Sequence, residues 1–130
     1  MLSRKTAAHE LISELRRKLP YDMDIASTYA VLLAAEGEKG KAEEQIRLSI
    51  GTGEGRGHFH HAEYNIASAY ALMGDRRQAL QWLRKTAQDR FPCYPLFERD
   101  PNLNNLRTDP DFATFLSEMK SLWERRRAAL

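Results

Sequence analysis

Apolar residues recur with a helical period over most of this chain, and the clearest case runs from residue 58 to residue 90. In the first half of that stretch, apolar or small residues fall three or four positions apart, at Ala62, Ile66, Ala67, Tyr70 and Ala71. In the second half the same spacing is kept by Ala79, Leu80, Leu83 and Ala87. Gly74 and Asp75 separate the halves, because glycine adopts the left-handed conformation at a helix end and aspartate caps a helix start. The pattern predicts two antiparallel helices whose backbones approach closely at Ala67 and Ala79.

The same periodicity predicts a leading helix over residues 6–19 and an earlier helical pair over residues 24–50. Pro20 ends the leading helix, because proline cannot continue the helical hydrogen-bond ladder. Between the two pairs, residues 51–57 alternate glycine with polar residues, so we expect no helix there and a slack connection. A phosphate-binding loop is disfavoured, because no strand precedes these glycines and no Gly-Lys-Ser/Thr ending follows them.

Residues 91–130 follow a different pattern, with two Asp-Pro steps that each place a capping residue before proline. Asp100-Pro101 predicts a short turn, and Asp109-Pro110 predicts a long helix over residues 110–126. The aromatic and proline-rich residues 91–97 predict an extended or single-turn connector packed by its rings. Residues 1–130 are therefore expected to form one all-α domain.

Composition agrees with a folded domain and limits the cellular compartments and partners to be expected. The chain has 130 residues, of which 42% are hydrophobic and 29% are charged, which predicts a globular protein rather than a disordered one. Its net charge of +2 is too small to indicate a nucleic-acid or membrane partner. Cys93 is the single cysteine, so no internal disulfide can form, and we find no signal-peptide pattern. These features predict a cytoplasmic protein.

The predicted turns repeat along the chain. GEKGKA at residues 37–42 aligns with GDRRQA at residues 74–79, and Ala8, Ala42 and Ala79 fall at similar intervals. The repeat resembles the tetratricopeptide repeat, a helical pair of about 34 residues with the pattern Trp-x2-Leu-Gly-x2-Tyr, Ala-x3-Phe and Pro. In the later pair the matching residues are Ile66, Ala67, Tyr70, Ala79 and Leu83. In the earlier pair they are Tyr29, Ala30, Leu33, Ala42 and Ile46.

The segment after the second pair is also familiar. It resembles the closing segment that follows the last tetratricopeptide repeat in many bacterial proteins, where Leu-Arg-x-Asp-Pro-x-Phe leads into a final helix. The matching residues here are Leu106, Arg107, Asp109, Pro110 and Phe112. Together the resemblances imply an all-α, right-handed superhelical stack: a leading unpaired helix (6–19), two pairs (24–50 and 58–90) and a closing segment (91–130).

The resemblance implies a non-catalytic scaffold, without a cofactor, that binds a peptide or partner protein in a bacterial signalling or regulatory assembly. The groove positions carried over from the family are Asp24, Ser27, Val31, His61, Tyr64, Asn65 and Ser68. Lysines and arginines that would hold a terminal carboxylate are missing from these helices, so an apolar or mixed segment is the expected occupant. The alternative is that these residues simply face water. Docking in this groove predicts that Tyr64→Ala or Ser68→Arg abolishes partner capture and leaves the fold intact.

The leading helix lacks a mate to cover its apolar side, at Ala8, Ile12 and Leu15. An uncovered apolar face normally indicates an interface. Two arrangements would cover it, a homodimer through this edge or further repeats upstream.

Candidate chemistry is sparse. His58, His60 and His61 could bind a metal ion, but their i, i+2, i+3 spacing differs from the i, i+4 pairs that ligate metals on a helix. Arg125, Arg126 and Arg127 could contact nucleic acid, although a solvated helix end is the simpler interpretation. Cys93 has no adjacent basic residue to activate it, and no acid–base pair is evident, so an enzyme is not expected.

Overall fold

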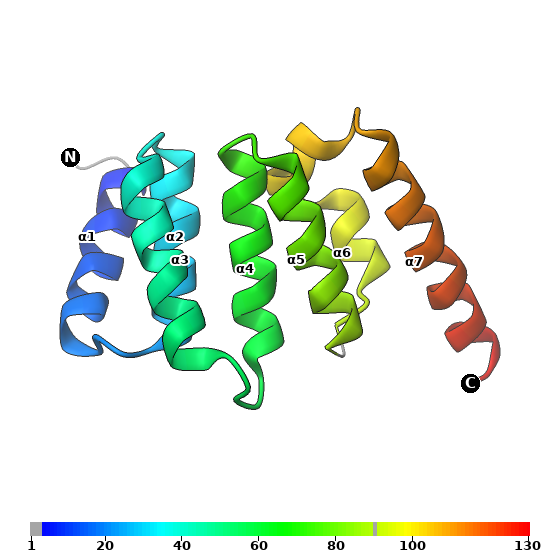
Figure 1. Ribbon diagram of the computed structural model, residues 1–130, viewed down its shortest axis with the longest axis horizontal. Coiled ribbons are helices and arrows are strands. Elements are labelled where there is room, and N and C mark those ends of the chain that lie inside the picture. The colour runs from blue at the N-terminus through cyan, green and yellow to red at the C-terminus, as the bar shows by residue number, and fades with distance from the viewer. Residues whose placement is uncertain (1–3, 90) are drawn as a thin grey trace.

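The computed structural model describes residues 4–89 and 91–130, which form seven α-helices and one 3₁₀-helix and contain no strand. The elements are α1 Arg4–Lys18, α2 Met23–Ala35, α3 Lys39–Gly53, α4 Phe59–Leu72, α5 Arg76–Gln88, α6 Tyr94–Arg99, η1 Pro101–Leu106 and α7 Pro110–Ala128. The longer helices are arranged side by side along the long axis of the molecule, with α1 at one end and α7 at the other (Figure 1). The all-α prediction is confirmed. None of these helices is long and apolar enough to cross a membrane.

Aspartate side chains begin four of these elements, and three of these caps are the ones that the sequence predicts. Each accepts a hydrogen bond of 2.8–3.1 Å from a backbone amide two or three positions later, which satisfies a donor that the helix leaves free. The four capping residues are Asp22, Asp75, Asp100 and Asp109. Because capping depends on local sequence, these helix starts could be predicted closely.

The core lies between two helical pairs. α2 packs on α3, α4 packs on α5, and α2 and α4 pack on each other. Ala67 and Ala79 are fully buried where α4 meets α5, and Leu83 is buried beside them. Tyr70 is 7% exposed, and its hydroxyl donates to Glu43 Oε2 at 3.2 Å. The small residues therefore lie where the sequence places the close approach of the two helices.

The glycine-rich stretch differs from its prediction. α3 continues through Gly53, so only residues 54–58 connect the pairs. Gly53 is buried, and a Cβ at this position would lie 2.7 Å from Phe59 Cδ2 and 2.9 Å from Met23 Cβ. The expectation of a slack loop without packing is wrong here, because the last turn of α3 packs against the starts of α2 and α4.

α1 lies against α2 and is the least buried of the longer helices: none of its described residues is fully buried. Polar contacts attach it to the first pair. Ser13 Oγ donates to the Tyr29 hydroxyl at 3.2 Å, and Arg16 Nε donates to Gln45 Oε1 at 2.9 Å. Hydrogen bonds of its polar side chains therefore attach α1 to the first pair, and much of its apolar side remains exposed.

The C-terminal elements close the other end of the molecule. η1 packs on α4, where Asn105 Nδ2 donates to the carbonyl oxygen of Ala71 at 2.9 Å. α6 packs on α7, whose Phe112 and Phe115 are fully buried. The predicted connector thus contains a short helix, α6.

Candidate functional site

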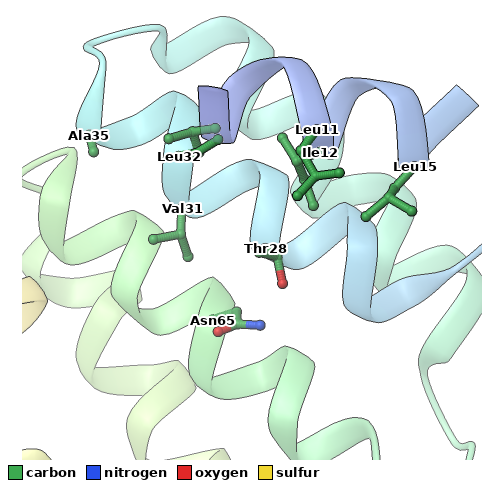
Figure 2. Close-up of a pocket in the computed structure, with 9 residues that line it drawn as sticks. Leu11, Ile12, Leu15, Thr28, Val31, Leu32, Ala35 and Asn65 are labelled. Atoms are coloured by element: carbon green, nitrogen blue, oxygen red, sulfur yellow. The ribbon is translucent and has the colours of Figure 1, made fainter. Parts of the chain in front are cut away.

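An apolar groove lies between α1 and α2 and reaches α4 (Figure 2). It encloses about 420 Å³. Its lining consists of apolar side chains with two polar members, Thr28 and Asn65. The lining residues are Ala8, Leu11, Ile12 and Leu15 of α1, Thr28, Val31, Leu32 and Ala35 of α2, and Asn65 of α4. Leu11 is 60% exposed.

The groove arises because α2 has apolar residues on two sides. Ala30 and Leu33 are buried on one side, against the rest of the core. Val31, Leu32 and Ala35 lie on another side, which α1 covers only in part. A helix that is apolar on most of its circumference is expected to be enclosed by neighbours. Here one part of that enclosure is open.

The groove positions that the sequence analysis assigned to Tyr64 and Ser68 of α4 are not open in the structure. The Tyr64 ring stacks on Phe97 with a centroid distance of 5.8 Å and meets Phe91 edge-on at 6.0 Å. Its hydroxyl donates to an Asp100 carboxylate oxygen, and burial with this hydrogen bond raises the pKa of Tyr64. Ser68 is 1% exposed and donates to the Tyr64 carbonyl oxygen. Residues 91–106 therefore occupy this part of the assigned groove, and Ser68→Arg would disrupt packing.

The other assigned groove residues are divided by the structure. Ser27 is fully buried, donates to the Asp24 carbonyl oxygen at 3.1 Å and accepts from Asn65 Nδ2 at 3.1 Å. The Asp24 and His61 side chains are exposed but do not line the groove. Only Val31 and Asn65 of the assigned set line it.

Those two residues join the three that the sequence assigned to a self-association edge, Ala8, Ile12 and Leu15. Sequence reasoning missed Leu11, Thr28, Leu32 and Ala35. The i, i+3, i+4, i+7 spacing of Thr28, Val31, Leu32 and Ala35 was the available signal for a second exposed face on α2.

A second candidate site lies at the start of α4. His58, His60 and His61 each offer a ring nitrogen, and these atoms all lie within 4.8 Å of one another. The His60 and His61 ring centroids are 4.2 Å apart, and those of His58 and His60 are 6.0 Å apart. His58 precedes the helix in the left-handed conformation, with φ of 68°. The i, i+4 rule that argued against a metal site applies within a helix, so it does not cover His58.

A cavity of about 620 Å³ lies beside the histidines. Its titratable lining includes His58, His60, Glu63, Lys85 and Asp89. Partial burial, followed by the neighbouring His61 and His58, lowers the pKa of His60. The His60 ring is therefore held toward its neutral form, in which a ring nitrogen can accept a proton or a metal ion.

Glu63 is the unusual member of that lining. Its side chain is fully buried, and neither carboxylate oxygen has a hydrogen-bond partner among the described residues. Lys85 Nζ lies 3.5 Å from Glu63 Oε2, but it also pairs with Asp89 at 3.3 Å. Burial and the nearby Asp89 carboxylate raise the pKa of Glu63 to about 7. A buried carboxylate with so little compensation is costly to ionise.

The remaining sequence candidates line neither of these cavities, but Cys93, Arg126 and Arg127 line a third one together. Arg125, Arg126 and Arg127 are exposed in the last turn of α7, where positive charge complements the helix dipole. Cys93 is half-buried just before α6.

Comparison with known proteins identifies no relative: no family model, no curated protein and no solved structure matches this chain.

Proposed function

We propose that this chain is a non-catalytic protein-interaction module, a right-handed stack of tetratricopeptide-like pairs that binds an amphipathic helix of a partner protein between α1 and α2. The observation that carries the proposal is the open apolar groove, with Leu11 and Ile12 on one wall and Val31 and Leu32 on the other. Continuous exposed apolar surface of this kind usually marks an interface. Amphipathic helices commonly bind in such grooves through residues spaced three and four apart.

Internal repetition supports a helix as the occupant. Ala8 of α1 aligns with Ala42 and Ala79, which are fully buried in their helical pairs, whereas Ala8 is exposed. Ile12 aligns with Ile46, which is 1% exposed, and Ile12 is only half-buried. The positions that a first helix covers in the two complete pairs are thus uncovered on α1.

The packing of α2 indicates how the occupant would lie. α2 packs on both α3 and α4, which are respectively the second helix of its own pair and the first helix of the next. By the same arrangement, a helix in the groove would pack on both α1 and α2. The groove residues carry no charge, so the partner helix is expected to present an apolar face.

The groove is tested with the α2 sequence itself as a probe, because α2 fills the corresponding place on α3 and α4. A fluorescent peptide of residues 21–37, with its helix stabilised by a lactam bridge, would be titrated with the protein and followed by anisotropy. Leu11→Glu should weaken binding at least about tenfold. Burial of the leucine side chain under the peptide contributes about 1.5–3 kcal/mol, and the variant loses this contribution and places a charge in the apolar groove. The matched control is Leu19→Glu, since Leu19 is 51% exposed and does not line the groove.

Equal affinity of the two variants, or no binding by any of the proteins, would argue against helix docking in this groove. Light scattering on the same samples shows whether the occupant is instead a second copy of this chain. A dimer that Leu11→Glu dissociates, and Leu19→Glu does not, would identify a second copy of this chain as the partner.

We further propose that the protein acts in the cytoplasm, in a signalling or regulatory assembly. The absence of a second cysteine to pair with Cys93 agrees with a reducing compartment.

A further inference from the structure

We propose that His58, His60 and His61 bind one divalent transition-metal ion, with zinc as the expected ion. Their ring nitrogens lie within 4.8 Å of one another on a single short segment. Imidazole nitrogens are good ligands for zinc, nickel, cobalt and copper, and zinc sites that keep an open position for water have three protein ligands.

The local structure brings the three rings together from an otherwise unsuitable spacing. His60 and His61 lie in the first turn of α4, and His58 lies just before it. The left-handed backbone of His58 turns this residue out of the helical path. His58 and His61 are exposed, so their side chains have room to rotate. Such rotations can bring the three ring nitrogens to the bond distance of about 2.0–2.1 Å from one zinc ion.

The His58 backbone is itself an argument for a function. Among the non-glycine residues that the structure describes, only His58 has a positive φ. Such a conformation is unfavourable for a residue with a Cβ, and glycine would adopt it freely. Strained backbone often occurs where a side chain has a binding role, and here the side chain is an imidazole close to two others.

A buried carboxylate, Glu63, lies in the same cavity but is not one of the three possible metal ligands. This fully buried carboxylate lines the cavity that His58 and His60 also line, and it lacks a hydrogen bond among the described residues. Lys85 pairs with both Glu63 and Asp89, so one ammonium group faces two carboxyl groups. A dication held by the imidazoles would add positive charge that helps to balance them. The open cavity leaves room for water or an external anionic group to complete the coordination of the ion.

The test uses the full chain, purified without a histidine tag. Zinc chloride would be titrated calorimetrically, and cobalt chloride would be followed through its visible absorption, which reports on the coordination of the ion. We expect one ion per chain. His60→Ala and His61→Ala should each weaken binding at least about 100-fold, because even an outer-shell partner contributes 10–100-fold.

Two further variants make the test specific. His9→Ala removes the fourth histidine of the chain, which lies on α1 beside Glu36, and should leave affinity unchanged. His58→Gly removes the imidazole and also relieves the backbone strain, so it should lose metal affinity while its melting temperature without metal stays level or rises.

Less than one ion bound per chain overturns the proposal, as does unchanged affinity in any of the three cluster variants. Circular dichroism on each variant shows that the fold is kept. The cluster shares no residue with the groove between α1 and α2, so either proposal can fail without the other.

Discussion

At the scale of single residues, Glu63 makes stability depend on pH in the range between mildly acidic and neutral. Its pKa is raised to about 7 because it is buried and lies near Asp89. In the unfolded chain the same carboxyl releases its proton near its ordinary pKa of 4.5. Between about pH 4.5 and pH 7 the unfolded state therefore binds fewer protons than the folded state, and linkage requires that stability falls as pH rises.

We expect Glu63→Gln to remove this fall. The contribution amounts to as much as about 3 kcal/mol between pH 4.5 and pH 7, at about 1.4 kcal/mol for each pKa unit. Urea denaturation of both proteins at pH 5 and pH 7.5, in the presence of a chelator, measures the difference. Glu63 itself lowers the pKa of Asp89, which is already ionised at both pH values, so the difference between the two proteins reports mainly on Glu63. Parallel pH profiles would show that Glu63 is ionised in the folded protein without this cost.

At the scale of elements, α3 shows that two glycines in one helix can have opposite effects. Gly53 packs against Met23 and Phe59, and an added Cβ would meet both side chains. Gly51 lies in the same helix with nothing within 4 Å of the corresponding position. Intrinsic propensity favours alanine over glycine at both positions by about 1 kcal/mol.

We therefore expect Gly51→Ala to stabilise the protein by up to about 1 kcal/mol, and Gly53→Ala to destabilise it by about 1–3 kcal/mol through overpacking. Chemical denaturation of the two variants beside the wild type is sufficient to compare them. If Gly53→Ala is as stabilising as Gly51→Ala, the end of α3 is not packed as closely as the structure has it.

At the scale of the whole molecule, burial is distributed unevenly along the stack. α4 contains nine buried residues, whereas α1 contains none. Local opening requires less free energy where fewer apolar contacts must be broken. Amide hydrogen exchange should therefore be faster in α1 than in α4.

Hydrogen exchange followed by mass spectrometry tests this order, and it also links stability to binding. Addition of the helical peptide of residues 21–37 should slow exchange in α1 and α2 without a comparable change in α7. Equal protection of α1 and α4 in the free protein would contradict the expected order.

The positions of the helices could be predicted from local features. Apolar residues three and four apart indicated the helices, and Asp75, Asp100 and Asp109 indicated three of the starts. The end of α3 was missed, because propensity argues against helix at its last glycines and only packing on Met23 and Phe59 favours it.

The candidate site was harder to predict, since accessibility depends on what lies across each helix face. Tyr64 and Ser68 have the spacing of groove residues, yet Phe97 and Asp100 pack on Tyr64, and Ser68 is buried. Leu11 belongs to an ordinary apolar face by its spacing, yet it is 60% exposed at the edge of the groove. No periodicity within one helix contains this information.

The sequence by itself thus determined the all-α class, the order of the helices and most of their limits, because periodicity, capping and proline act over a few residues. Tertiary structure alone decided which apolar faces are covered, and it brought three histidines of unfavourable spacing within 4.8 Å of one another. The physical reason is that burial and convergence depend on segments far apart in the chain and on single backbone angles such as that of His58.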